Sequence, residues 1–174
     1  IYARDDIRIS MVVKKKLNVD TDETSIKFKF NPTDTVQDVN RNIREKISEN
    51  KKEGINNNVD KIVGLLNKLP RCLFSATIEL LKAMDFDGVM PKAIHELSPF
   101  HTSVFVTNMG SIGAEPIYHH IYNFGTTSIF IALGNRRKQR VIDKDGKITE
   151  RKVMKLRFVA DERIADGYYL SVTL

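Results

Sequence analysis

The apolar residues of this chain alternate with polar ones near both ends, and in between they recur every three or four residues. Alternation is typical of a strand with one buried face, whereas the longer period is typical of a helix that packs on one side. Alternation covers residues 7–13 and 26–30, and the helical period covers residues 36–52, 59–69 and 71–84. The chain therefore begins with a predicted hairpin, which a group of helices follows.

The last third of the chain is again typical of strands. After a short helix near residues 92–97, a strand is expected at residues 104–107, with a glycine-containing turn behind it. Residues 128–134 form a continuous apolar run, which predicts a strand covered on both faces. The Asp145-Gly146 pair is a strong hairpin signal before the returning strand. This order predicts an α+β fold, an α/β sandwich with a mixed and mostly antiparallel sheet packed by helices.

Length and composition limit the class of protein. The 174 residues suit one domain, and a net charge of +6 permits an anionic partner without requiring one. Cys72, the single cysteine, cannot form an internal disulfide, and no signal-peptide pattern is present, so we expect a cytoplasmic protein. No apolar run reaches the roughly eighteen residues of a membrane-spanning helix. Because the sequence opens with Ile1 rather than Met, we expect it to be part of a longer polypeptide.

The most informative segment for function is the strand and turn of residues 158–167. Its polar positions are Asp161, Glu162, Arg163 and Asp166, and Gly167 closes it. The segment resembles the Asp-His-Arg-x-x-Asp-Gly signature of the catalytic domain of 2-oxoacid dehydrogenase acyltransferases, with Glu162 at the place of the family's catalytic histidine. The resemblance implies that Asp166 braces the loop through an arginine, and an Asp-Gly pair also suits the turn before a helix.

A second segment, residues 104–113, resembles the same family's Phe-Thr-Ile-Ser-Asn-Leu-Gly-Ser-x-Gly strand and turn. The resemblance implies that Thr107, which keeps the hydroxyl group at this place, stabilises the oxyanion of a tetrahedral intermediate. It also makes Asn108, Gly110 and, in the first motif, Arg163 the expected substrate-binding residues. An ordinary strand-end threonine and a glycine that only permits the turn remain open as alternatives.

The resemblance also implies a fold and an assembly. The fold would be that of chloramphenicol acetyltransferase, incomplete at its N-terminus, with residues 1–174 as the C-terminal part of a single catalytic domain. Residues 55–100 do not fit the family pattern and would be a helical elaboration. The family's homotrimer has active sites between subunits. In these sites the thiol of coenzyme A, or of a lipoyl group on a partner domain, attacks a thioester as the nucleophile.

Glu162 changes the chemistry expected of that site. Histidine accepts a thiol proton near neutral pH because its reference pKa is ~6.5, whereas that of a free glutamate is ~4.3. Burial would raise the pKa of a glutamate and make it a better base, whereas pairing with Arg163 would hold it charged. Two functions therefore stay open: a coenzyme A-dependent acyltransferase with altered base chemistry, or a catalytically inactive trimer-forming or ligand-binding protein of the same fold.

His119 and His120 are the candidates to replace the missing base. Adjacent residues of an extended segment face opposite ways, so only one of the two could enter a given site. Packing or surface exposure is the alternative for both histidines. A metal site would lack a third ligand at a suitable spacing, so we expect no metal.

Two larger segments leave their partners open. The basic run of residues 136–140 could contact the phosphates of coenzyme A, contact an acidic partner, or form a solvated hairpin. Since it lacks interleaved aromatic residues, we expect no nucleic-acid partner. The apolar helices of residues 59–84 could form core, an oligomer seam, the cover of an acyl pocket or a membrane-surface element.

Overall fold

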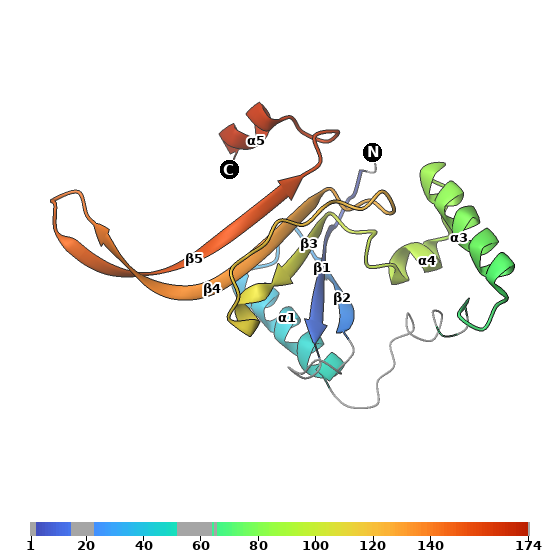
Figure 1. The fold of residues 1–174 in the computed structure, drawn as a ribbon, viewed down its shortest axis with the longest axis horizontal. Coiled ribbons are helices and arrows are strands. Elements are labelled where there is room, and N and C mark those ends of the chain that lie inside the picture. Colours follow the sequence, from blue (N-terminus) through green and yellow to red (C-terminus); the bar gives the residue numbers. More distant parts are fainter. Residues whose placement is uncertain (1–2, 15–22, 52–63, 65, 174) are drawn as a thin grey trace.

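The computed structural model describes residues 3–14, 23–51, 64 and 66–173 and has a five-stranded sheet at its centre (Figure 1). The strand order across the sheet is β2–β1–β3–β4–β5. The strands are β1 (Ile7–Lys14), β2 (Glu23–Phe30), β3 (Val104–Asn108), β4 (Ile129–Ile142) and β5 (Ile148–Ala160).

Two antiparallel hairpins flank the central strand β3, which is parallel to both of its neighbours. The β1–β2 hairpin pairs eight residues and the β4–β5 hairpin twelve, whereas the two parallel pairings involve three and five. The sheet is therefore mixed, with most of its residue pairs antiparallel, and the predicted fold class is confirmed.

Helix α1 (Val36–Lys51) covers the β1–β2 half of one sheet face and forms the main apolar core with it. Alternation in β2 places three side chains on that face, each at most 4% exposed: Ile26, Phe28 and Phe30. The apolar side chains of α1 that pack on them recur at helical spacing: Val39, Ile43 and Ile47. Thr35 begins the helix, because its hydroxyl accepts from the backbone of Asp38, whose carboxylate accepts from Thr35 N at 3.1 Å.

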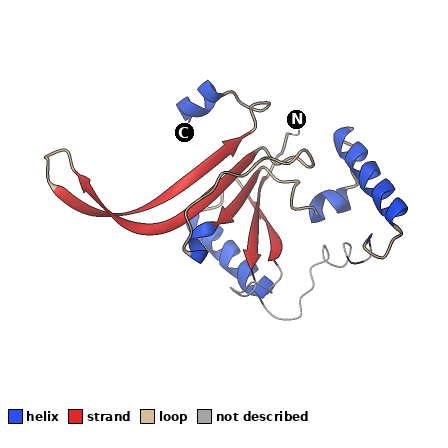
Figure 2. Ribbon diagram, viewed as in Figure 1, coloured by secondary structure: helices blue, strands red, loops and turns tan. Residues whose placement is uncertain are grey.

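The short helix α4 (Lys92–Leu97) lies against the opposite, polar face of β1 and β2 (Figure 2). Arg8 and Lys27 alternate with core residues along their strands and so project to this face. Lys27 Nζ donates to the carbonyl of His95 at 2.8 Å, and Arg8 donates to Glu96 at 2.6 Å. Helices therefore cover both sides of this hairpin, as expected for an α/β sandwich.

Helix α3 (Arg71–Phe86) projects from the body of the molecule and contributes no buried residue (Figure 1). Leu73, Leu80 and Phe86 are 53%, 61% and 92% exposed. The helical period of this segment is therefore confirmed, but its interpretation as core is wrong for the described part of this chain. The helix predicted at residues 59–69 lies mostly outside the described residues. Among the helices that are described, none is long and apolar enough to cross a membrane.

The β4–β5 hairpin extends well beyond the other strands as an arm, residues 134–155 (Figure 1). The basic run of residues 136–140 is part of β4 and is exposed, so its place in a hairpin is confirmed, while contact with phosphates or an acidic partner stays a prediction. The arm holds nine basic and three acidic residues, which gives it a net charge of +6, equal to that of the whole chain. A register shift between Leu133 and Arg136 marks its start.

One prediction about the body of β4 is wrong, because its two faces are not equally covered. On one face, Phe130 and Ala132 are 6% and 1% exposed, whereas Ile129, Ile131 and Leu133 on the second face are only half-buried. Their β5 neighbours on that second face, Leu156 and Phe158, are 44% and 41% exposed. The reason is that α1 packs on the β1–β2 end of this face and does not extend to β4 and β5.

Candidate functional site

The turn after β3 carries the first group of predicted site residues. Thr107 is half-buried near the end of the strand, and its hydroxyl lies 4.0 Å from Met109 Sδ. The 3₁₀ helix η1 (Met109–Ile112) follows at once. Asn108 Oδ1 accepts from Ser111 N at 3.2 Å, and Ser111 Oγ donates to Asn108 O at 2.7 Å. Asn108 thus closes the turn that holds Thr107 in place.

Gly110 allows this turn to touch the neighbouring strand. A Cβ atom at Gly110 would lie 2.3 Å from the carbonyl oxygen of Gly134 in β4. The contact therefore requires a residue without a side chain, which is a positioning role for Gly110. That Asn108 and Gly110 also bind substrate stays a prediction.

The strand-end motif carries the second group of predicted residues. Arg163 Nε donates to both carboxylate oxygens of Asp161 at 2.9 and 3.0 Å, and Arg163 Nη2 donates at 2.6 Å. These hydrogen bonds lower the pKa of Asp161. Arg163 is thus paired with Asp161, and among the described residues no ion pair or hydrogen bond holds the exposed side chain of Glu162.

Asp166 begins the last helix, α5 (Gly167–Thr173), because its Oδ1 accepts from Tyr169 N at 2.7 Å. The interpretation of the Asp-Gly pair as a turn before a helix is confirmed. Among the described residues no arginine bonds to Asp166, and the arginine of the motif bonds to Asp161, so the brace implied for Asp166 stays a prediction.

Thr107 and Glu162 lie toward opposite ends of the strands. Val104 of β3 pairs with Ile129 of β4, which pairs with Ala160 of β5, so these three residues form one row across the sheet. Thr107 lies three residues beyond this row in one direction, and Glu162 lies two residues beyond it in the opposite direction. At a rise of about 3.3 Å per residue, they are roughly 16 Å apart along the strands. One chain therefore does not bring these two side chains together.

A buried network of hydrogen bonds near α3 had no signal in the sequence. His101 is fully buried, and its Nε2 lies 2.8 Å from Asp85 Oδ1 while its Nδ1 lies 2.8 Å from Ser98 Oγ. Asp85 Oδ2 also accepts from Gly125 N at 2.6 Å. This acceptor pattern fits a neutral imidazole that donates from Nε2 and accepts from Ser98. These hydrogen bonds connect α3 to the body of the molecule.

The histidine pair after the oxyanion turn is only partly exposed. His119 stacks on Phe130, with ring centroids 4.3 Å apart, and its Nε2 is buried with no hydrogen-bond partner in the described chain. His120 is exposed and packs against Tyr122. The packing interpretation is thus confirmed for His119 and surface exposure for His120. Among the described residues, no three acidic, histidine or cysteine side chains lie close enough to hold a metal ion.

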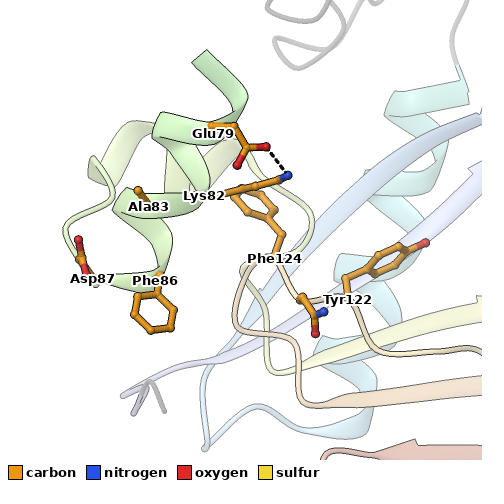
Figure 3. Close-up of a pocket in the computed structure, with 8 residues that line it drawn as sticks. Glu79, Lys82, Ala83, Phe86, Asp87, Tyr122 and Phe124 are labelled. Atoms are coloured by element: carbon orange, nitrogen blue, oxygen red, sulfur yellow. Dashed lines mark hydrogen bonds and ion pairs between the residues drawn. The ribbon is translucent and has the colours of Figure 1, made fainter. Parts of the chain in front are cut away.

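Two cavities adjoin these elements. A polar cavity of about 850 Å³ lies where β5 ends, and its lining includes Asp161, Arg163 and His95. A second cavity, of about 600 Å³, lies between the C-terminal half of α3 and residues 122–124 (Figure 3). Neither Thr107 nor Glu162 lines these two cavities.

The buried histidines predict a loss of stability at mildly acidic pH. Burial lowers the pKa of His95 to about 4, and it also lowers the pKa values of His101 and His119. The unfolded chain therefore binds more protons below pH ~6.5, and the free energy of unfolding falls between that pH and about pH 4. Urea denaturation at pH 7.5 and 4.5 is expected to show a loss on the order of 2 kcal/mol.

Carboxylates act in a different pH window. Hydrogen bonds from Arg8 and Arg163 lower the pKa values of Asp6 and Asp161, so the stability that these acids add is lost only below about pH 4.

His95→Gln is the matched variant for the histidine prediction, and it should flatten the dependence of the free energy of unfolding on pH between pH 6.5 and 4.5. A free energy of unfolding that stays constant across that window would contradict the assignment.

Comparison with known proteins supports the fold. Residues 95–172 match the family model of the 2-oxoacid dehydrogenases acyltransferase (catalytic domain). A probable dihydrolipoamide acetyltransferase from Listeria monocytogenes superposes with a TM-score of 0.57 at 16% identity, covering 97% of this chain and 53% of that one. No curated protein sequence matches the chain.

A dihydrolipoamide acetyltransferase from Azotobacter vinelandii gives a TM-score of 0.56 at 10% identity, covering 97% of this chain and 51% of that one. The present chain thus spans about half the length of both solved structures. The resemblance in the two motifs is confirmed: residues 95–172 match the acyltransferase catalytic-domain family of the 2-oxoacid dehydrogenases, and the chain has the fold of that domain.

Proposed function

We propose that this chain is the C-terminal part of a cytoplasmic catalytic domain that transfers an acyl group between coenzyme A and an acceptor thiol. One observation carries the proposal. Thr107 and Glu162 stand in two matched motifs at opposite ends of the strands of one sheet, so a site that needs both must form between copies. A closed ring of three copies would supply such a contact three times, each time from the same two surfaces.

The proposed reaction is an exchange of thioesters at this contact. The attacking thiol gives its proton to the Glu162 carboxylate while its sulfur bonds to the thioester carbonyl carbon. The electron pair of the carbonyl moves to oxygen, where the Thr107 hydroxyl of the adjacent copy donates a hydrogen bond. The bond to the leaving sulfur then breaks, and that sulfur takes the proton from Glu162. The acceptor thiol would be carried by a lipoyl group on a partner domain.

Other motif residues position these two groups. Asp166 fixes the start of α5, and the Arg163–Asp161 pair holds the turn on which Glu162 stands. In the Azotobacter enzyme, the catalytic roles of a histidine and of an asparagine four residues later were investigated. Glu162 and Asp166 have this spacing, which supports placing both in the site.

The alternative is a catalytically inactive trimer-forming or ligand-binding protein of the same fold. The exposure of Glu162 favours it, because burial is what turns a carboxylate into a stronger base, and Glu162 is exposed in this chain. A contact with a second copy would have to supply that burial.

Acyl-coenzyme A turnover by the full-length protein tests the proposal. Thr107→Val is expected to lower kcat roughly a hundredfold by removing the oxyanion donor, while Thr107→Ser keeps most of the activity. Glu162→Gln should lower kcat at least tenfold. Glu79→Gln, an exposed change on α3, is the control and should have no effect. An inactive wild type that gains turnover with Glu162→His would establish the alternative.

A further inference from the structure

Thr107 shares one face of the sheet with an arginine that neither motif includes. Thr107 pairs with Ala132, and Ala132 pairs with Arg157 on β5, so the three residues form a row across β3, β4 and β5. Paired residues of neighbouring strands project to the same face. Two strand spacings place the Thr107 and Arg157 backbones about 10 Å apart, with Ala132, which is 1% exposed, between them.

Arg157 is half-buried, and no carboxylate neutralises it within the described chain. Its guanidinium carbon lies 4.4 Å from the centroid of the Tyr118 ring. Its Nε atom is buried and has no hydrogen-bond partner among the described residues. Stacking on an aromatic ring holds a guanidinium in place while its N–H groups, which lie in the guanidinium plane, stay available for another partner.

Two neighbouring cations differ from Arg157 in this respect. Lys155, two residues earlier on β5, lies 3.2 Å from Glu115 Oε2, and Arg137 of β4 lies 3.3 Å from Glu115 Oε1. Both of them therefore have an acidic partner, the shared Glu115. Arg157, in contrast, is held in one orientation by Tyr118, has no acidic partner among the described residues, and lies in the same row as Thr107. A partly buried cation is usually paired, so this arrangement indicates that an anion arrives with the ligand.

We propose that Arg157 binds an oxyanionic group of the substrate, a carboxylate or a phosphate, next to the thioester carbonyl that Thr107 contacts. The inference rests on the proposed function, since the identity of the site comes from Thr107. Carboxylate and phosphate both match the forked donor geometry of a guanidinium. A carboxylate would stand at the far end of the acyl chain, and a phosphate would belong to coenzyme A. Arg157 is then a specificity-determining residue.

The test compares four substrates on the full-length protein: acetyl and succinyl thioesters, each on coenzyme A and on N-acetylcysteamine, which has no phosphate. If Arg157 binds a carboxylate, Arg157→Met raises KM at least tenfold for both succinyl thioesters and leaves both acetyl thioesters unchanged. If it binds a phosphate, the same variant raises KM for both coenzyme A thioesters and leaves both N-acetylcysteamine thioesters unchanged. Lys155→Met is the control, because that lysine already has Glu115 as its partner, and it should give wild-type KM values.

A second measurement separates this inference from the proposed function. The Tm of wild type is measured with sodium succinate and with sodium phosphate, and it should rise with one of them by at least 2 °C more than the Tm of Arg157→Met. This effect needs no turnover, so its presence in an inactive protein supports the Arg157 site while the proposed function fails. Arg157→Lys, which keeps the charge and loses the fork, is expected to show an intermediate shift and serves if Arg157→Met does not fold. Equal Tm shifts in wild type and both variants, with unchanged KM values, would overturn the inference.

Discussion

Gly110→Ala is expected to lower the free energy of unfolding by roughly 3 kcal/mol, the upper end of what overpacking usually costs. The added Cβ would lie 2.3 Å from Gly134 O and 3.1 Å from Asn135 Cα, which are backbone atoms of a paired strand. Neither can rotate away as a side-chain end would. The turn must therefore separate from β4, and Thr107, three residues earlier, moves with it. Urea denaturation followed by circular dichroism measures the loss.

A matched glycine tests whether the close approach is the cause. Gly167 begins α5, and a Cβ atom there would meet nothing within 4 Å, so Gly167→Ala should change stability by less than about 0.5 kcal/mol. In an active protein, Gly110→Ala should also reduce turnover more than Gly167→Ala does. Equal stability of the two variants would show that the turn adapts to a side chain and that Gly110 does not position Thr107.

Asp85→Ala is expected to cost about 2 to 4 kcal/mol, because it leaves two donors unsatisfied at roughly 1 to 3 kcal/mol each. The change leaves His101 Nε2 and Gly125 N without their acceptor, and His101 is fully buried. Helix α3 has no buried residue of its own, so this carboxylate is the main polar attachment that the structure shows between α3 and the body. Hydrogen exchange across residues 71–86 should rise along with the global loss of stability.

The control for Asp85 is the exposed carboxylate two residues later. Asp87→Ala removes an acid at the end of the same helix without removing a hydrogen bond from a buried donor, so its effect should stay within about 0.5 kcal/mol. If Asp85→Ala unfolds at the same urea concentration as Asp87→Ala, the network does not anchor α3.

Hydrophobic period accounts for most of the fold that could be predicted from sequence. The alternation of Ile26, Phe28 and Phe30 and the helical spacing of Val39, Ile43 and Ile47 arise from one interface, so each pattern supports the other. The length of β4 was not predictable in this way. Beyond Asn135 both faces of the strand meet water, and a strand without a buried face has no apolar period to detect.

The site was predictable only where a local motif encodes it. Asn108 and Asp166 each accept a hydrogen bond from the backbone three residues later, so sequence order alone places them. Asp85 and His101 are sixteen residues apart, and Arg157 and Tyr118 meet only through the sheet, so their contacts depend on tertiary structure. Sequence reasoning also allowed Glu162 to pair with Arg163, whereas the backbone turn presents Asp161 to that arginine instead.

The uneven distribution of charge along the molecule has a kinetic consequence. Residues 134–155 carry +6, which equals the net charge of the whole chain, so the positive charge stands at one extremity and the remainder has no net charge. Such a molecule has a large electric dipole moment, and an approaching polyanion turns it before the two surfaces touch. Added salt screens this electrostatic interaction beyond about 10 Å at 0.1 M. Rates of association with a polyanion should therefore respond to ionic strength more than the lifetimes of the complexes do.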